Sequence, residues 1–382
     1  MSPPLPRLNY QMIGMTVGVE LPDSRAGRNL GQELSVYPRA PANARVDLQV
    51  QLVEEQLPAL GLVNPKQHVE LDDGFVARFG PVDIRFRLDD HGLRDITFRT
   101  RGSRSNMARF VERARSIQFS AADEQVGQFF HELMLIPSAY FRPDRVLIHA
   151  SAFQAPSGKV IAIGGTGGVG KTSLELALCL HRDFLFVTDD ICVLSDSGHV
   201  WPILAPPKIY GYNTQDDREL RRRIFEGRNT IDRLHWRWRS RRGSDKVRRR
   251  APVDQLYGSF STAGGQIGRY LILCREARAD LSPEAIAPAV AADLSVTIMS
   301  VEYAAFNRHV SWHEYNRRVQ GREPALKLDD VFDRWRRLAR AVLKNVPCHL
   351  VRVPLEMHHD EFKKQMSNLI EEMERDGSHS IE

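Results

Sequence analysis

Residues 159–173 read Lys-Val-Ile-Ala-Ile-Gly-Gly-Thr-Gly-Gly-Val-Gly-Lys-Thr-Ser, and this stretch decides the fold of the chain. Residues 165–172 match the phosphate-loop pattern G-x-x-x-x-G-K-[ST] without a mismatch. Glycine adopts backbone angles that are closed to other residues, so successive N–H groups can converge on a phosphate. A helix that starts directly after the loop adds its positive end to the same anion site.

The residues around the loop predict the strand, loop and helix order that the pattern requires. Residues 160–163 are apolar and mostly β-branched, as in a buried parallel strand, and apolar residues continue at helical spacing from Leu174. We expect Lys171 to reach the β- and γ-phosphates of ATP, and Thr172 to bind Mg²⁺. The alternative is a glycine-rich turn that only joins a strand to a helix. The predicted nucleotide-binding residues are Gly165, Thr166, Gly167, Gly168, Val169, Gly170, Lys171, Thr172 and Ser173.

Two acidic residues follow the next apolar run. Residues 184–187 predict a buried strand, placed beside the strand that enters the loop, and Asp189 and Asp190 come directly after it. Carboxylates at the C-terminal end of such a strand lie where a magnesium nucleotide binds. The alternative is a solvated strand end or turn. Upstream, residues 145–151 predict a strand next to the one that enters the loop. This strand contains His149, which could lie near the nucleotide; the alternative is a core histidine that is hydrogen-bonded to the backbone.

The combination of Leu147, His149 and Ala150, the loop, and Thr188-Asp189-Asp190 resembles the bacterial HPr kinase/phosphorylase family and its wider group of HPr-kinase-like proteins. The family has a histidine before the loop lysine and an aspartate pair after it at the spacings found here. The resemblance covers about residues 130–215. It implies an α/β fold with a P-loop core of the HPr kinase and phosphoenolpyruvate carboxykinase type.

The resemblance also implies ATP- and Mg²⁺-dependent transfer of phosphate to a serine-type hydroxyl of a protein or peptide. Lys171 and Thr172 would hold phosphate and Mg²⁺, Asp189 would activate the acceptor, Asp190 would assist the metal, and His149 would lie beside the transferred phosphate. Which aspartate is the base is left open. The founding enzymes have glycine where Ala150 stands, and a downstream E-[LI]-R-G segment that serves phosphorolysis; the nearest match here is Glu-Leu-Arg-Arg at residues 219–222. Phosphorolysis and HPr as acceptor therefore do not follow.

The basic charge is concentrated in residues 218–250, from Arg218 to Arg250. This segment has fourteen Lys or Arg and four Asp or Glu, whereas the whole chain of 382 residues carries a net charge of only +5. Trp236 and Trp238 are interleaved with arginines, a pattern that suits phosphate contacts with stacking on bases. Three interpretations stay open: a nucleic-acid site, a site for an acidic protein substrate, and a solvated or mobile insertion.

The rest of the chain predicts three regions. Residues 1–45 are poorly defined, with one apolar patch at 12–19; residues 46–140 form a β-rich module with strands at 75–79, 82–88 and 93–98 and a closing helix that Pro137 stops; residues 141–382 form the kinase core, with a basic insertion at about 216–258. Further strands are expected at 270–274 and 349–353, and helices at 329–343 and 361–373, the last one polar.

The remaining signals bound the location and the metal chemistry. The chain has no run of about 18 apolar residues and no secretory pattern, and its four cysteines form no C-x-x-C pair. We therefore expect a cytoplasmic protein with reduced thiols and no membrane association. His309, His313, His358 and His359 fit no zinc spacing and are interpreted as surface or structural residues. The oligomeric state is left open, a homo-oligomer included.

The resulting interpretation is a cytoplasmic kinase that uses ATP and Mg²⁺ and acts on a hydroxyl of a protein or peptide. Two other functions stay open. One is a nucleic-acid-associated NTPase or kinase that uses residues 218–250; the other is an ATP-sensing regulator that transfers nothing.

Overall fold

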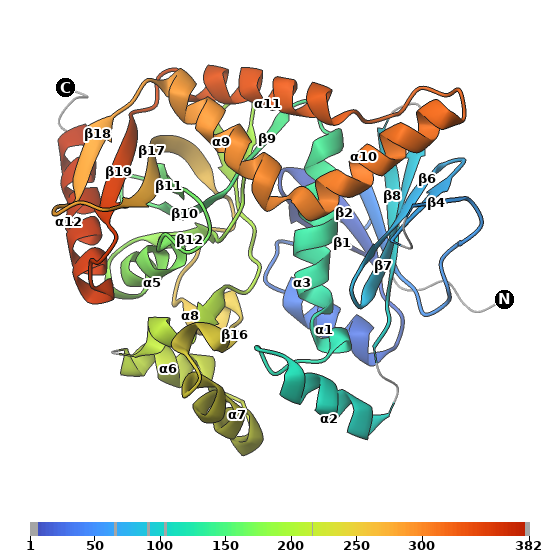
Figure 1. The fold of residues 1–382 in the computed structure, drawn as a ribbon, viewed down its shortest axis with the longest axis horizontal. Helices are drawn as coiled ribbons and strands as arrows, with labels where there is room; N and C mark the ends of the chain where they lie inside the picture. Colours follow the sequence, from blue (N-terminus) through green and yellow to red (C-terminus); the bar gives the residue numbers. More distant parts are fainter. Residues whose placement is uncertain (1–6, 65–66, 90–91, 103–104, 216, 379–382) are drawn as a thin grey trace. The chain divides into compact units, whose positions relative to one another are not determined.

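The computed structural model describes residues 7–64, 67–89, 92–102, 105–215 and 217–378. The chain is a mixed α/β protein that divides into two compact units, each built from three segments (Figure 1). Unit 1 takes its described residues from 1–141, 205–256 and 305–330, and unit 2 from 142–204, 257–304 and 331–382. Residues 205–256 and 305–330, which the sequence analysis assigned to the core that begins at 141, therefore pack in unit 1.

Unit 1 contains an eight-stranded sheet in the order β1-β2-β3-β8-β7-β6-β5-β4. The three antiparallel strands predicted between residues 75 and 98 are confirmed as β6, β7 and β8. The patch at 12–19, in the region left undefined, contributes to a hairpin that turns at Ile13 and Gly14, both at positive φ. The strands are β1 (Arg7–Met12), β2 (Met15–Glu20), β3 (Leu48–Leu52), β4 (Leu62–Asn64), β5 (His68–Leu71), β6 (Gly74–Phe79), β7 (Val82–Asp89) and β8 (Gly92–Thr100).

The closing helix of the predicted β-rich module differs from its prediction. It starts as α3 (Val126–Phe130), widens into a π-helical segment (His131–Leu135) and continues as α4 (Ile136–Ser138), so Pro137 does not stop it. Pro137 lacks the N–H for an i→i−4 hydrogen bond and follows the π-helical segment, where that bonding pattern is already replaced; α4 ends one residue later, at Ser138. The other helices of this unit are α1 (Arg25–Leu34), α2 (Asn106–Arg115), α6 (Arg218–Ile224), α7 (Thr230–Ser240), α8 (Val253–Leu256) and most of α10 (Ala304–Val319).

The basic segment is ordered secondary structure inside unit 1. Helices α6 and α7 are followed by β16 (Arg248–Arg250), which pairs antiparallel with β15 (Lys208–Tyr210). Arg250 also forms an ion pair of 2.7 Å with Glu33 of α1. The segment is therefore tied to the rest of the unit through β16.

Unit 2 is built on a nine-stranded mixed sheet. The order is β12-β10-β11-β17-β14-β13-β9, and β19 pairs with β17 and with β18. β11, β17 and β19 run parallel to one another, and the other pairs are antiparallel. The strands are β9 (Arg145–Ile148), β10 (Ala150–Gln154), β11 (Val160–Gly164), β12 (Leu185–Thr188), β13 (Cys192–Ser195), β14 (His199–Trp201), β17 (Gly265–Glu276), β18 (Ser282–Ala285) and β19 (Cys348–Pro354).

Two predictions about this sheet need correction. β12 does not lie beside β11, because β10 folds back as a hairpin and pairs with both of them. Residues 145–151 are not one strand, because β9 pairs with β13 whereas β10 pairs with β11 and β12. His149 lies at the change of partner. The predicted neighbour of the strand that enters the loop is found in β10, which forms a hairpin with β11, and β13 and β14 form a second hairpin.

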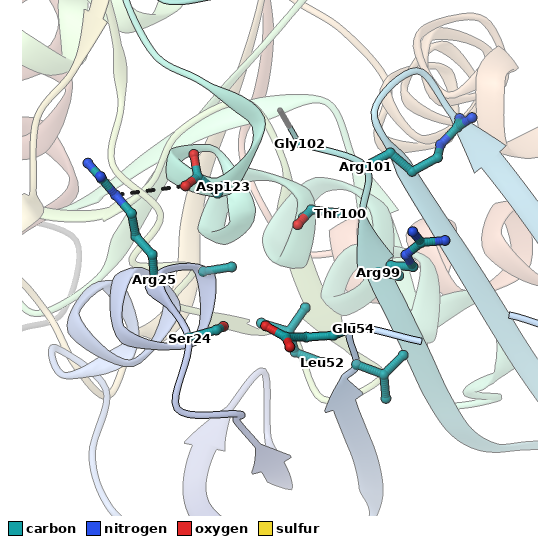
Figure 2. A pocket seen from close by; sticks show the side chains of 11 residues that line it. Ser24, Arg25, Leu52, Glu54, Arg99, Thr100, Arg101, Gly102 and Asp123 are labelled. Atoms are coloured by element: carbon teal, nitrogen blue, oxygen red, sulfur yellow. Dashed lines mark ion pairs between the residues drawn. The ribbon is translucent and has the colours of Figure 1, made fainter. Parts of the chain in front are cut away.

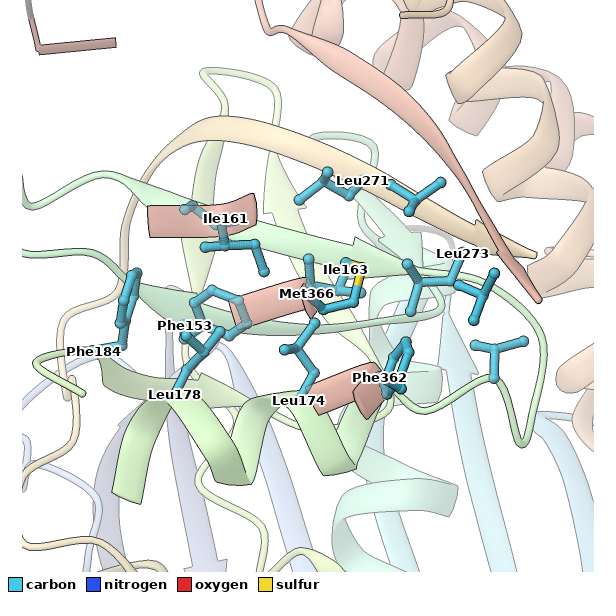
Figure 3. Packing of buried hydrophobic residues seen from close by; sticks show 14 of the residues in the cluster. Phe153, Ile161, Ile163, Leu174, Leu178, Phe184, Leu271, Leu273, Phe362 and Met366 are labelled. Atoms are coloured by element: carbon cyan, nitrogen blue, oxygen red, sulfur yellow. The ribbon is translucent and has the colours of Figure 1, made fainter. Parts of the chain in front are cut away.

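The core of unit 2 lies between the sheet, α5 (Lys171–His181) and α12 (His359–Ser378), as Figure 3 shows. Leu174 and Leu178 of α5 pack with Ile163 and Leu271 of the sheet. The terminal helix was predicted as polar, but α12 buries Phe362, Met366 and Ile370 in this core. The predicted residues 329–343 form α11 (Leu328–Leu343), and α9 (Pro288–Glu302) completes the helices of this unit.

Candidate functional site

The glycine loop, residues Gly165 to Gly170, connects β11 to α5 in unit 2. Gly165, Gly168 and Gly170 have φ angles of 135°, 79° and 111°, a region that favours glycine. At Gly165 an added Cβ would lie 2.6 Å from the carbonyl oxygen of Leu273, so a larger residue would also collide with β17. The glycines of the sequence pattern are therefore required by the observed backbone.

The predicted nucleotide-binding residues split into exposed backbone and buried side chains. Thr166, Gly167 and Gly168 are exposed. Val169 packs into the core of unit 2, and Ser173 is buried on the first turn of α5. Val169 can therefore contribute only its backbone to a ligand on the loop.

Lys171 is buried at the start of α5, with a side chain that bends back over the loop. Its Nζ donates hydrogen bonds of 2.9 Å to the carbonyl of Gly165 and 3.0 Å to that of Thr166. Burial lowers the pKa of the Lys171 ammonium, while the carboxylates of Asp190 and Asp189 act to raise it. The ammonium therefore lies in the field of the two predicted acids, on the same side of the loop.

Asp189 joins the end of β12 to the start of α5. Its Oδ1 accepts a hydrogen bond of 2.9 Å from the Thr172 hydroxyl and another of 2.9 Å from the Ser151 hydroxyl. Asp190 has a φ of 66°, unusual for a residue other than glycine. Strained backbone of this kind occurs often at functional sites, where the surrounding structure holds it.

Glu175 is a functional candidate that the sequence analysis missed. It is fully buried, accepts a hydrogen bond from the Tyr257 hydroxyl and lies within hydrogen-bonding reach of Asp189. Burial and the neighbouring Asp189 raise the pKa of the Glu175 carboxyl well above its usual range. In the protonated form, Glu175 can donate a hydrogen bond to Asp189. This bond gives the second carboxyl oxygen of Glu175 a partner and fixes the position of the Asp189 carboxylate.

The sequence carried a signal for Glu175, since it follows Lys171 by four positions and interrupts the apolar run of α5. Residues four positions apart share one helix face, so this glutamate was placed to reach the same site as the lysine.

A carboxylate already contacts the glycine loop. The N–H of Gly167 donates a hydrogen bond of 3.0 Å to Oε1 of Glu302, the last residue of α9. The same oxygen lies 3.6 Å from Nδ1 of His149, which is buried where β9 meets β10. The loop therefore accepts a negatively charged group at the amide of Gly167, and His149 adjoins that group.

The oxygen atoms at this site suit a hard divalent cation. Among the described residues, no group of three or more His, Cys, Asp or Glu is arranged to hold a metal ion. A magnesium ion at a nucleotide site needs fewer, because it is commonly held by one or two carboxylates together with phosphate oxygens and water. Thr172 on the first turn of α5 and Asp189 and Asp190 after β12 are the candidates for such a set.

His309 and His313 belong to a hydrogen-bonded network inside unit 1. His68 lies 3.3 Å from His309, and Glu70 lies 3.2 Å from His68 and 2.9 Å from His313. All four side chains are buried. The structural interpretation of these histidines is confirmed, and the surface interpretation is wrong for both.

The basic segment of unit 1 divides into buried and exposed charge. Arg249 is fully buried and donates a hydrogen bond of 2.6 Å to Asp232, and burial lowers the pKa of Arg249 to about 10. Trp236 is only 3% exposed, whereas Trp238 is 46% exposed with the Arg242 guanidinium 3.9 Å from its ring centre. The predicted interleaving of tryptophan and arginine is therefore not one continuous surface.

A cavity of about 460 Å³ lies elsewhere in unit 1, between α1 and the ends of β3 and β8 (Figure 2). Three of its five charged side chains are in ion pairs, since Arg25 lies 3.7 Å from Asp123 and Arg101 lies 3.4 Å from Asp83. The other two, Glu54 and Arg99, have opposite charges, so they leave the cavity little net charge to select a ligand.

No known protein-family model matches the chain, and no curated protein matches it as a relative. Among the described residues, no single helix is long and apolar enough to cross a membrane. The bent pair of α9 and α10 reaches the length and apolar composition of a membrane span only when the two helices are counted together.

Proposed function

We propose that unit 2 is a P-loop kinase core of the HPr-kinase-like type, which transfers the γ-phosphate of ATP to a hydroxyl of a protein or peptide with the help of Mg²⁺. The observation that carries this proposal is the 2.9 Å hydrogen bond between Thr172 and Asp189. It joins the hydroxyl that ends the loop pattern to the first acid after β12, and these two groups are the pair expected to share a magnesium ion.

The residues of the loop bind and position the nucleotide. The exposed N–H groups of Thr166, Gly167 and Gly168 would face the phosphates, and the Lys171 ammonium, now on two loop carbonyls, lies close enough to exchange them for phosphate oxygens. The Glu302 carboxylate would leave the Gly167 amide, because a phosphate needs that donor. When bound, Mg²⁺ supplies charge neutralisation between the phosphates.

The contact with Thr172 favours Asp189 as the magnesium ligand and Asp190 as the base. These roles are the reverse of those that the family resemblance implies. In the transfer step the acceptor oxygen forms a bond to the γ-phosphorus, the bond from that phosphorus to ADP breaks, and the acceptor proton passes to the Asp190 carboxylate. Glu175 and Ser151 hold Asp189 in place from the protein side.

Transfer of label tests the proposal. The protein is incubated with γ-labelled ATP, Mg²⁺ and a cell lysate, and the labelled species is identified. Transfer should occur with the wild type and fall by roughly 10³-fold in both Asp189→Asn and Asp190→Asn. Asp183→Asn, an exposed acid between α5 and β12, is the matched control and should retain transfer.

Nucleotide binding measured in parallel separates the two acids. Asp189→Asn should lose Mg²⁺-dependent ATP binding, whereas Asp190→Asn should keep binding and lose only transfer. Binding without transfer in the wild type would instead indicate an ATP-sensing regulator, and full transfer by both variants would overturn the proposal.

A further inference from the structure

Helices α6 and α7 of unit 1 present one helical face each to a common groove. The lining residues of α6 and its C-terminal end follow the spacing i, i+3, i+4, i+7 at positions 218, 221, 222 and 225, and positions 230, 233, 234 and 237 of α7 repeat it. Residues at this spacing lie on one side of a helix. The space between these faces has a volume of about 500 Å³, and we call it the arginine groove.

Five arginines line the arginine groove, and their charge is mostly uncompensated. Arg222 forms an ion pair of 2.7 Å with Glu219. Within the described part of the chain, Arg218, Arg221, Arg233 and Arg237 have no carboxylate partner, and all four are exposed. The groove therefore presents a concentrated positive field to the solvent, which favours a negatively charged partner.

The floor of the arginine groove is apolar and fixed. The ring of Phe225 meets that of Trp236 edge to face with ring centres 5.3 Å apart, and both side chains are less than one tenth exposed. Beneath them, the guanidinium of Arg249 lies 5.3 Å from the Trp236 ring and is held by Asp232. A floor supported in this way is organised before any partner arrives.

Apolar side chains extend the floor along α7 onto the open surface. Ile231, Leu234 and Trp238 follow the spacing i, i+3, i+7 and are 50%, 56% and 46% exposed. A partner on this surface gains by burying apolar groups as well as by pairing charge. These apolar side chains disfavour a nucleic acid as the partner. Its charged phosphates would lie against Ile231 and Leu234, and Trp236 is too buried to stack on a base.

We propose that the arginine groove docks an acidic amphipathic helix of a protein partner, with its apolar residues on Phe225, Leu234 and Trp236 and its carboxylates on the surrounding arginines. This arrangement is the helix-in-groove mode of recognition, with charge selecting the partner. The proposal concerns unit 1 and does not require phosphate transfer by unit 2, so the two stand or fall separately.

Fluorescence anisotropy of the full chain tests the proposal. The probe is a labelled helical peptide of roughly 18 residues with leucine on one face and glutamate on the other. A peptide with glutamine in place of glutamate and a single-stranded DNA of equal charge are the comparison probes. The glutamate peptide should bind at least about tenfold more tightly than the glutamine peptide, because four of the five groove arginines have no carboxylate partner among the described residues.

Variants locate the binding. Arg221→Glu combined with Arg237→Glu should weaken the glutamate peptide by at least about tenfold, and Leu234→Asp should weaken it by a similar factor. Arg308→Glu combined with Arg337→Glu makes the same change of net charge at exposed arginines of α10 and α11 and should leave binding within about twofold. Circular dichroism spectra verify that each variant is folded.

Three outcomes would overturn the proposal. One is equal binding of the glutamate and glutamine peptides; another is retention of peptide binding in the charge-reversed groove. The third is tighter binding of the DNA than of the glutamate peptide, where DNA binding is lost in the charge-reversed variant but kept in Leu234→Asp. That result would make the groove a nucleic-acid site.

Discussion

The glycine-loop site of unit 2 and the basic segment of unit 1 treat charge in opposite ways. Around the loop, Lys171 and Glu175 are buried and Asp189 is half-buried, and each contacts a neighbour that determines its position. In the arginine groove, Arg221 and Arg237 are exposed, without a carboxylate partner in the described ranges. Buried ionisable groups of the first kind orient reacting groups, whereas exposed charges of the second kind attract a partner.

The same contrast exists within the basic segment. Arg249 and Arg221 are both arginines of residues 218–250, but Arg249 is a structural residue that Asp232 neutralises in the interior of unit 1. A charge count therefore says little about binding until the buried pairs are removed from it. The following variants are ways to break or sharpen this comparison.

Replacing Lys171 should have the largest effect. Lys171→Met removes the cation that the loop holds beside Asp189 and Asp190, so phosphate transfer from labelled ATP should fall by at least about 10³-fold. The circular dichroism spectrum should stay that of the wild type. Transfer within about tenfold of the wild type would mean that the buried ammonium has only a structural role.

Arg249→Met should cost about 1.5–3 kcal/mol of unfolding free energy, because the buried Asp232 carboxylate loses one of its two guanidinium partners and keeps only Arg228. Urea denaturation measures the loss. Arg221→Met is the matched control and should change stability by less than about 0.5 kcal/mol, because that side chain is exposed. Equal losses in the two variants would remove the distinction between structural and exposed arginines.

Glu175→Gln should change how stability depends on pH. The raised pKa of Glu175 means that folding takes up a proton, so the wild type loses stability as pH rises above the ordinary carboxyl value of 4.5. The loss is about 1.4 kcal/mol per pH unit until the folded pKa is reached. Glutamine stays neutral and keeps a donor for Asp189. The stability of the variant relative to the wild type should therefore increase between pH 5 and 8, by at most about 1.4 kcal/mol per pH unit.

Denaturation at several pH values tests this prediction, and transfer activity provides a second measurement. Glu175→Gln should keep its transfer rate, whereas Glu175→Leu should lose it, because leucine cannot donate a hydrogen bond to Asp189. Parallel pH curves for the wild type and the glutamine variant would contradict a protonated Glu175.

Glu302→Gln should have the smallest effect and the opposite sign. The Glu302 carboxylate occupies the Gly167 amide, so neutralising it should strengthen ATP binding by roughly three- to tenfold. Isothermal titration calorimetry measures the change, with Glu284→Gln, an exposed acid of β18, as control. Weaker binding in Glu302→Gln would assign the carboxylate a supporting role instead of a competing one.

The sequence predicted the parts of unit 2 that depend on local order. Strand β11, the glycine loop, α5 and the acids after β12 are consecutive, and their residue types specify backbone angles and helical spacing directly. It failed where pairing is non-local. The pairing of β10 with β11 is local and was expected, whereas no periodicity reveals that β12 pairs with β10 and not with β11.

The limits of the site prediction have a similar cause. Glu175 and Glu302 reach the loop from the buried face of α5 and from the end of α9, and only tertiary packing brings them there. The assignment of Arg249 to the interior needed its contact with Asp232 across the turn from α7 to β16. Composition had counted that arginine as surface charge.

The most direct test of the central claim is calorimetric titration of the full chain with ATP, with and without Mg²⁺, for the wild type and Thr172→Val. If Thr172 and Asp189 hold the metal beside the loop, the wild type binds one ATP more tightly with Mg²⁺, and Thr172→Val loses about tenfold or more of affinity only when Mg²⁺ is present. Absence of ATP binding to the wild type, or equal affinities of both proteins in Mg²⁺, would contradict the account.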